Sequence, residues 1–380
     1  MVIPFDTASD HHKDSEPQLD TTIDSAARVS VRPRWIILAS IVALIFALLP
    51  HLDLLGGGVI PILQALLPTA AILVLISVAV TVIATVIRAA NKARYRPRQN
   101  WWVVPLILAL GAAIGMVPML LRPPRAAPPA EIPTRSIRVL SLNVQFSGAD
   151  VSALSDVMAE WAPHIVMFIE VDEGFISRLA ETGALEALAL RYRTGDTAGL
   201  SGAAGTVVLS TWPLSEFGQV PSVGWHLDET GEVVFDGHYV GFQQPTAIVS
   251  VPDSWSIQLA ALHPPPPVFD SYYWHQGLQA IGAWQQGVQR QYRPLIIAGD
   301  FNASTAHPVF RRATAGLTNT ASAVGLFPRP TWPANSVIPP FTQIDHILVS
   351  RQIAALNWHR FTIPGTDHFG VIAELAVPVR

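Results

Sequence analysis

The chain has 380 residues, of which 50% are hydrophobic and only 14% are charged, and its formal net charge is −4. A soluble domain carries about 25% charged residues, so part of this chain is expected to lie in lipid. The chain contains no cysteine. That absence excludes disulfides, thiolate metal sites and a cysteine nucleophile.

The first third of the sequence predicts a membrane anchor. Residues 1–34 are polar and without periodicity, and we interpret them as a disordered cytoplasmic tail. Residues 35–121 contain three apolar stretches, at about 35–55, 59–87 and 101–121. Each stretch approaches or exceeds the ~20 residues that a helix needs to cross a bilayer. We therefore expect three transmembrane helices over residues 35–121.

Basic residues set the expected orientation. Three arginines precede the first apolar stretch and five basic residues separate the second from the third, whereas the loop between the first and the second has none. Because basic loops stay in the cytoplasm, this pattern predicts a multi-pass protein of the cell membrane with a cytoplasmic N-terminus. Everything after residue 121 is then extracytoplasmic, and the Pro-rich residues 122–135 form a semi-rigid linker.

Residues 136–380 have the pattern of an α/β domain. Apolar runs typical of strands alternate with stretches of helical spacing such as 151–161 and 272–290, which favours two packed sheets. This segment has 12 Arg, no Lys and 20 Asp or Glu, a net charge of −8. Proteins that bind long nucleic acid usually present a basic face, so long DNA or RNA is disfavoured as the substrate.

Polar side chains stand at the ends of the predicted strands. A buried strand cannot carry ionisable side chains without partners, so these residues are expected to meet at one edge of the domain. Their types are those that handle metal ions and phosphate. In chain order they are Asn143, Glu170, His263, Asp300, Asn302, Asp345, Asp367 and His368.

These residue types fit metal-assisted phosphoester hydrolysis. The reaction needs a divalent cation, a base that orients and deprotonates water, and donors that meet the charge of the transition state. A carboxylate such as Glu170 suits Mg²⁺, and Asn143 can support that metal or bind phosphate through its amide.

Two pairs of residues complete the expected chemistry. Asp300 and Asn302 are two positions apart, so on an extended backbone they point the same way, and one can activate water while the other holds a phosphate oxygen. His368 needs a carboxylate to fix its tautomer and raise its basicity, and Asp345 is the natural candidate.

Residues 136–380 resemble the endonuclease/exonuclease/phosphatase (DNase I-like) superfamily. The resemblance implies a four-layer α/β/β/α sandwich that depends on Mg²⁺ or Mn²⁺. The motifs that carry it are Ser141-Leu142-Asn143-Val144, Phe168-Ile169-Glu170, Ala261-Leu262-His263, Ala298-Gly299-Asp300-Phe301-Asn302, Gln343-Ile344-Asp345-His346 and Gly365-Thr366-Asp367-His368.

The resemblance also implies a role for each site residue. Glu170 binds the metal with Asn143 beside it, and Asp367 completes the metal or hydrogen-bond shell. Gln145 stands where some members carry a second acidic ligand, which favours a single metal ion. The five implied catalytic residues are His263 near the scissile phosphate, Asp300 on the nucleophilic water, Asn302 on phosphate, and Asp345 paired with His368, which stabilises the transition state.

The three apolar stretches before such a domain resemble membrane proteins linked to teicoplanin resistance, as does Thr331-Trp332-Pro333-Ala334 followed by Pro339-Pro340. Simple loop packing explains Trp332 equally well. The resemblance favours a lipid-linked substrate such as undecaprenyl pyrophosphate.

We therefore predict a membrane-anchored phosphoester hydrolase that acts outside the cell on a lipid-linked or small phosphorylated substrate. Its partners would be the bilayer and that substrate, with no stable protein partner. One alternative is an extracellular nuclease, which would need a basic surface at the site. The other is a non-enzymatic envelope binding module. The arginines available for a basic surface are Arg191, Arg193, Arg311 and Arg312.

Overall fold

The structure is a computed structural model. The predicted tail, apart from its last two residues, and most of the predicted linker lie outside the residues that it describes. Those residues are 33–53, 58–91, 103–120, 133–197, 204–221, 226–227, 233–234, 242–268, 271–325 and 329–379.

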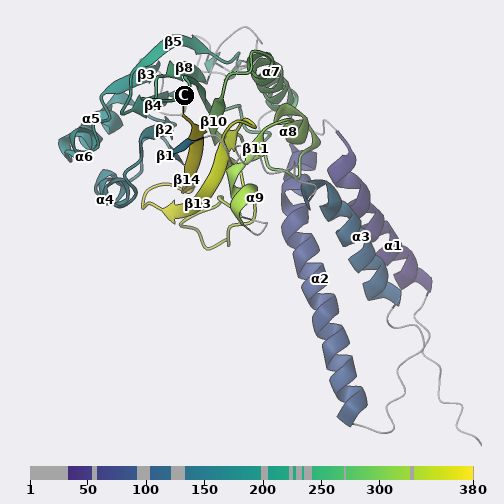
Figure 1. Cartoon of the computed structure of the whole chain (residues 1–380). Coiled ribbons are helices and arrows are strands. Elements are labelled where there is room, and N and C mark those ends of the chain that lie inside the picture. The colour runs from purple at the N-terminus through teal and green to yellow at the C-terminus, as the bar shows by residue number, and fades with distance from the viewer. Residues whose placement is uncertain are drawn as a thin grey trace, which may run out of the picture.

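Three apolar helices precede the α/β domain (Figure 1). They are α1 (Pro33–Leu48, extended by the 3-10 turn η1, Leu49–His51), α2 (Val59–Asn91) and α3 (Val103–Leu120). Two segments, Arg34–His51 and Val59–Ala84, are long and apolar enough to cross a membrane, and the apolar part of α3, Val103–Met119, is shorter. Two of the three predicted spans thus have the required length.

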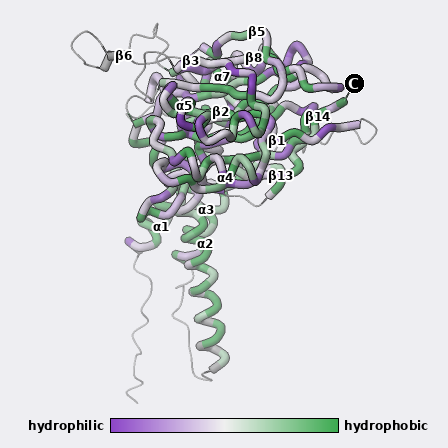
Figure 2. The backbone as a smooth tube through the Cα atoms, turned by 90° about the vertical axis from the view of Figure 1, so that its left-hand side faces the viewer, coloured by the Kyte–Doolittle hydropathy of each residue, from purple (hydrophilic) through white to green (hydrophobic). Residues whose placement is uncertain are grey.

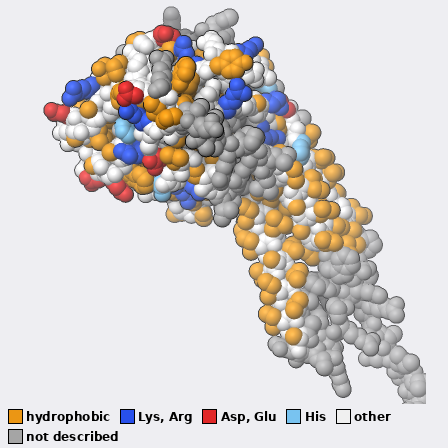
Figure 3. All heavy atoms as spheres, viewed as in Figure 1, with side chains coloured by type: hydrophobic (Ala, Val, Ile, Leu, Met, Phe, Trp, Pro, Cys, Tyr) orange, Lys and Arg blue, Asp and Glu red, His pale blue; other side chains and the backbone are white. Residues whose placement is uncertain are grey.

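The three N-terminal helices expose apolar side chains, whereas the α/β domain exposes charged ones. α2 is hydrophobic along most of its length (Figure 2). In the space-filling view, hydrophobic side chains cover the helices, and Lys, Arg, Asp and Glu side chains gather on the α/β domain (Figure 3). An apolar surface of this extent needs lipid or protein to cover it.

The α/β domain is built on two six-stranded sheets. The first has the order β13-β14-β1-β2-β4-β3 and the second the order β11-β12-β10-β9-β8-β5, and β6 and β7 form a separate pair. The strands are β1 (Thr134–Asn143), β2 (Ile165–Ile169), β3 (Tyr192–Asp196), β4 (Thr206–Ser210), β5 (Leu214–Gln219), β6 (His226–Leu227), β7 (Val233–Val234), β8 (Pro245–Val249), β9 (Ile257–Leu262), β10 (Leu295–Asp300), β11 (Thr318–Asn319), β12 (Asp345–Val349), β13 (Ala354–Thr362) and β14 (Phe369–Pro378).

Helices cover the outer face of each sheet. Leu154 and Met158 of α4 pack on the first sheet, and Leu278 and Ile281 of α7 pack on the second. A third core lies between the two sheets. The four-layer α/β/β/α sandwich that the sequence predicts is therefore confirmed. The helices of the domain are α4 (Val151–Trp161), α5 (Glu173–Glu181), α6 (Ala184–Ala187), α7 (Ser271–Arg290), α8 (Pro308–Ala313) and α9 (Thr320–Val324).

The pleat of the central strands divides their side chains between the cores. On β1, Ile137 and Val139 face the other sheet, whereas Leu140 and Leu142 face the helices. The same alternation holds on β2, β9, β10 and β12, as successive side chains of a strand point to opposite faces. This alternation also decides where a polar residue at a strand end points.

Candidate active site

Four of the predicted site residues point into the space between the sheets. Asn143 and Asp345 are inward-facing residues at the ends of β1 and β12, Asp300 is the last residue of β10, and His263 directly follows β9. In each case the residue two positions away on the same strand faces the other sheet, or is a small buried residue. Residues from both sheets therefore converge at one edge of the sandwich.

Two site residues leave this alternation through a left-handed backbone. Glu170 follows β2 with φ 58°, and Asn302 lies beyond β10 with φ 49°. The expectation that Asp300 and Asn302 share one extended backbone is therefore wrong. The Asn302 amide nitrogen donates to Pro264 O at 3.0 Å, and its backbone N–H donates to Asp300 Oδ1 at 2.8 Å. Asn302 thus braces Asp300 and the loop after His263.

Asp300 lies at the centre of the site. Its Oδ2 accepts a hydrogen bond from Asn143 Nδ2 at 3.2 Å and lies 3.7 Å from His368 Nε2 and 4.0 Å from His263 Nε2. Burial, and next the charge of Asp345, raise the pKa of Asp300 to about 6, against the opposing effect of the two histidines. A carboxylate that titrates near neutrality can accept a proton from water.

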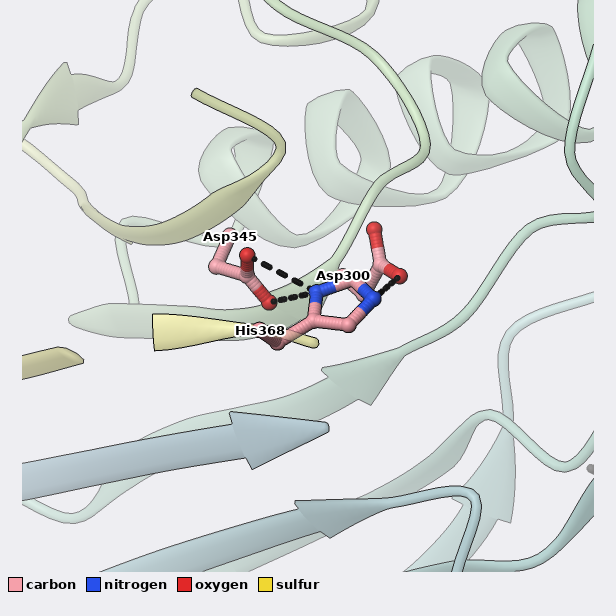
Figure 4. Close-up of side chains that lie close together, drawn as sticks. All are labelled: Asp300, Asp345 and His368. Carbon is pink, nitrogen blue, oxygen red and sulfur yellow. Dashed lines mark hydrogen bonds and ion pairs between the residues drawn. The ribbon is translucent and has the colours of Figure 1, made fainter. Parts of the chain in front are cut away.

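His368 is paired with Asp345, as the sequence predicts (Figure 4). Its Nδ1 lies 3.2 and 3.1 Å from the two oxygens of Asp345, and its Nε2 faces Asp300. Burial alone would lower the pKa of His368, but the charges of Asp345 and then Asp300 raise it to about 10. The imidazole is therefore held as a cation that donates from Nδ1 to Asp345.

Glu170 is held by two donors. Asn143 Nδ2 donates to its Oε1 at 3.0 Å, and the Phe146 N–H donates to its Oε2 at 3.2 Å. His263 Nε2 lies 3.6 Å from Oε1. Burial raises the pKa of this carboxyl group, and the hydrogen bond from Asn143 opposes the increase. A raised pKa marks a carboxylate that a cation would stabilise.

Asp367 lies at the more open side of the site, where its side chain is 38% exposed. Trp332 Nε1 donates to its Oδ2 at 3.0 Å, and its Oδ1 lies 3.7 Å from His368 Nε2. Its backbone N–H donates to Gln145 Oε1 at 2.9 Å. Gln145 therefore helps to position Asp367.

The residues of this site fit a divalent cation. Four carboxylates meet here, and within the described part of the chain their ion pairs are with histidines and not with Lys or Arg. The surplus of negative charge calls for a cation. Oxygen ligands such as Glu170 and Asp367 suit Mg²⁺ or Mn²⁺.

Asp300, Asp345 and His368 also form a group that could ligate a metal, with their ligand atoms within 4.8 Å of one another. Because His368 Nδ1 is bonded to both oxygens of Asp345, we interpret these two residues as a hydrogen-bonded pair. The Asn143 amide oxygen accepts the Gln145 N–H at 2.9 Å. Asn143 therefore holds Glu170 and Asp300 through its nitrogen, and its place beside the metal stays a prediction.

Sequence reasoning missed several residues that support the site. Thr331 Oγ1 accepts the Asp345 N–H at 3.0 Å, and Thr366 Oγ1 donates to Asn143 O at 2.8 Å. Gln244, which is fully buried, accepts the His263 N–H at 3.2 Å. Thr331 and Thr366 belong to motifs that the sequence singles out, but nothing in the sequence around Gln244 points to the site.

A protein-family model matches the segment of the chain that contains this site. The model of the endonuclease/exonuclease/phosphatase family matches residues 140–368, more than half of the chain. The chain belongs to this family. The match begins three residues before Asn143 and ends at His368, so it spans the whole set of residues described above. A comparison with curated proteins finds no match.

Solved structures agree with the family in their fold. TDP2 from Caenorhabditis elegans, with 13% identity, aligns over 72% of this chain and 85% of its own with a TM-score of 0.51. A family protein from Beutenbergia cavernae has 22% identity over 64% of this chain and 72% of its own (TM-score 0.49). One from Bacteroides thetaiotaomicron has 17% identity over 65% and 100% (TM-score 0.48). At 13% identity, the likeness to TDP2 shows the fold alone.

Proposed function

We propose that this protein is a membrane-anchored, divalent-metal-dependent phosphoester hydrolase whose catalytic domain lies outside the cytoplasm. Its substrate would be a lipid-linked or small phosphorylated molecule. The observation that carries the proposal is the buried Asp300 carboxylate, which lies between Asn143, His263 and the His368–Asp345 pair. A carboxylate with raised pKa beside a fixed imidazolium is a suitable base and donor for attack of water on a phosphoester.

Three residues would have separate roles in the hydrolysis. Asp300 orients a water molecule and takes its proton, for which a pKa of about 6 is suited. His368 donates from Nε2 to the phosphoryl oxygens, while Asp345 fixes its ring through Nδ1. His263 lies between Glu170 and Asp300, where it can donate to the same phosphoryl group.

The metal ion would be held by Glu170, with Asn143 beside it, and by Asp367. When bound, Mg²⁺ or Mn²⁺ would neutralise the phosphate charge and stabilise the leaving oxygen. Trp332 and Gln145 bind Asp367 and so fix its orientation, as residues around metal ligands commonly do.

The anchor supports a position at the membrane. Two helices have the length and composition of spans, and basic residues flank the ends of these helices that lie away from the domain. A reporter enzyme fused at the C-terminus and active only outside the cytoplasm would be expected. Activity of the reporter in the cytoplasm would refute the orientation.

The enzymatic test uses the full chain in detergent with Mg²⁺ and offers it undecaprenyl pyrophosphate, phospholipids and plasmid DNA. We expect release of phosphate or of a phosphorylated headgroup, and losses of roughly 10²–10⁴-fold in Asp300→Ala and His368→Ala. Activity that survives both substitutions would contradict the site, and cleavage of DNA alone would contradict the lipid substrate.

Three of the four arginines that a nuclease would need are bonded to other parts of the chain. Arg193 is paired with Glu173 on the outer face of the first sheet. Arg311 donates to Pro50 O and Arg312 pairs with Asp53, both next to α1. These contacts support a small or lipid-borne substrate over a long nucleic acid.

A further inference from the structure

A loop at the active site also reaches the membrane anchor. Residues 331–342, the rim loop, are closed at their base by backbone bonds between Trp332 and Thr342. That base is bonded to the site, because Thr331 Oγ1 accepts the Asp345 N–H and Trp332 Nε1 donates to Asp367. Displacement of the rim loop would therefore disturb two site residues directly.

The outer side of the rim loop lies against α2. Thr69 Oγ1 donates to Phe341 O at 2.9 Å. The neighbouring loop, which follows Asn302, contacts the same helix, since His307 Nε2 bonds Pro61 O at 2.9 Å and Ala306 packs with Ala71. The edge of the domain that carries the site is thus the edge that contacts the start of α2.

The tip of the rim loop is apolar and faces solvent. Val337 is fully exposed (101%) and Ile338 is 57% exposed, and Pro339 and Pro340 follow them. The loop has no charged residue over its twelve positions, 331–342. An apolar, uncharged tip next to transmembrane helices is typical of a segment that inserts into a membrane interface.

The length of α2 places the rim loop near the outer edge of the hydrocarbon core of the bilayer. The helix has 33 residues, about 50 Å at about 1.5 Å per residue, whereas the hydrocarbon core is about 30 Å thick. Basic residues from Arg88 onward mark its cytoplasmic end. About 20 residues counted back from Arg88 reach Pro68. Thr69, which contacts the rim loop, therefore lies at the outer edge of the core.

We propose that the rim loop inserts Val337 and Ile338 into the outer surface of the bilayer and so presents the active site to phosphoesters of membrane lipids. Five residues span at most about 18 Å, so the tip lies within that distance of Trp332, which holds Asp367. Lipid phosphates lie in the headgroup layer, within reach of a site so placed. The inference rests on the proposed function, and it names the partner of that site as the bilayer itself.

The first test measures insertion without any need for activity. Since the chain has no cysteine, an environment-sensitive fluorophore can be attached to Val337→Cys in the full protein, in nanodiscs of phosphatidylcholine and phosphatidylglycerol. The control is Phe217→Cys, which also replaces an exposed apolar side chain (60%), on the edge strand β5. We expect doxyl-labelled lipid to quench the fluorophore at position 337 about threefold or more strongly than at 217. Equal quenching at both positions would overturn the inference.

The second test measures substrate access. In the double variant Val337→Asp, Ile338→Asp, hydrolysis of a lipid phosphoester in the same nanodiscs should fall about tenfold or more, because charge opposes insertion. Hydrolysis of soluble bis(p-nitrophenyl) phosphate should stay within about twofold, and Phe217→Asp should change neither rate.

The outcomes separate this inference from the function on which it rests. Lipid hydrolysis unchanged by the double variant, or an equal loss on both substrates, overturns the inference. A wild-type protein that cleaves the soluble ester but no lipid phosphoester also overturns it and leaves the proposed hydrolase standing. A wild-type protein that cleaves neither substrate defeats the proposed function, and the quenching result then decides membrane insertion by itself.

Discussion

His368 lies between two carboxylates, and that position decides which protons it carries. Both carboxylate oxygens of Asp345 lie within hydrogen-bond distance of Nδ1, and Asp300 faces Nε2. The three residues come from β12, the turn before β14, and β10. They are therefore far apart in the sequence and do not share a strand. Their arrangement depends on the packing of the two sheets.

Removal of the Asp345 charge should weaken His368 as a donor. In Asp345→Asn, the pKa of His368 should fall from about 10 because its largest favourable interaction is lost. We expect kcat to fall by roughly 10²–10⁴-fold. NMR titration of the imidazole in chelator-treated protein would measure the pKa. Asp253→Asn, at an exposed carboxylate paired with Arg135, is the control, and an unchanged imidazole titration in Asp345→Asn would contradict the assignment.

Gly299 lets β9 and β10 pack closely next to two of the site residues. It has φ 145°, and a Cβ atom there would lie 2.0 Å from Leu262 O on the adjacent strand. Because His263 follows Leu262 and Asp300 follows Gly299, a side chain here would displace both. The close approach of the adjacent strand and the positive φ therefore explain why glycine stands in the Ala298-Gly299-Asp300 motif.

Gly299→Ala should consequently lower both stability and activity. The backbone conformation alone costs roughly 1–3 kcal/mol, and separation of β9 from β10 adds to that loss. Gly287→Ala on α7, where a Cβ atom meets nothing within 4 Å, should instead stabilise the protein by up to about 1 kcal/mol. Urea unfolding of both variants measures the difference, and a Gly299→Ala protein as stable as wild type would refute this account.

At the scale of elements, the alternation of the strands predicts more of the site than the motifs alone. Asn143, His263, Asp300 and Asp345 all point between the sheets because their strands alternate regularly. Glu170 and Asn302 could not be placed in this way, since each itself adopts a positive φ that its residue type does not require. Their positions become clear only in three dimensions.

Apolar runs do not identify the edge strands, which are largely exposed. β5 has one half-buried residue and five exposed ones, and β13 and β3 are also largely exposed. An edge strand without a buried face lacks the apolar run that identifies the central strands. Edge strands contribute little to the site, so the fold and most of the site were still predictable without them.

The rim loop should also control metal binding. Trp332→Phe retains the ring but removes the N–H that donates to Asp367 Oδ2. If Asp367 binds the metal, the Mg²⁺ concentration for half-maximal activity should rise by roughly 10–100-fold. Trp255→Phe, at a 51% exposed tryptophan, should leave it unchanged. A Trp332→Phe enzyme with wild-type Mg²⁺ dependence would show that Asp367 does not need this bond.

For the molecule as a whole, the N-terminal helices contact the domain at the edge that carries the site. The loop after β10 and the loop before β12 contact α2 and also carry or support Asn302 and Asp345. The sequence places three apolar stretches before a hydrolase-like domain, but it gives no sign that the two pack together at the site edge. Such contacts depend on surface shape, which periodicity does not encode.

His307 makes one of these contacts dependent on pH. Its Nδ1 accepts the Ser304 N–H at 2.8 Å, so its Nε2 carries the hydrogen that is donated to Pro61 O. Burial lowers the pKa of His307 to about 4. Protonation of Nδ1 would break the bond from Ser304 and place a charge in the contact between the domain and α2.

This arrangement predicts a loss of stability in mild acid. Between pH 6.5 and about 4 the unfolded chain binds a proton at His307 that the folded chain excludes. The free energy of unfolding should therefore fall as pH decreases through that window, by up to roughly 3 kcal/mol from this residue. Urea unfolding in detergent measures the slope, which should be smaller in His307→Gln and unchanged in His359→Gln, at an exposed histidine. Equal slopes in wild type and His307→Gln would show that His307 does not couple the docking of the domain to pH.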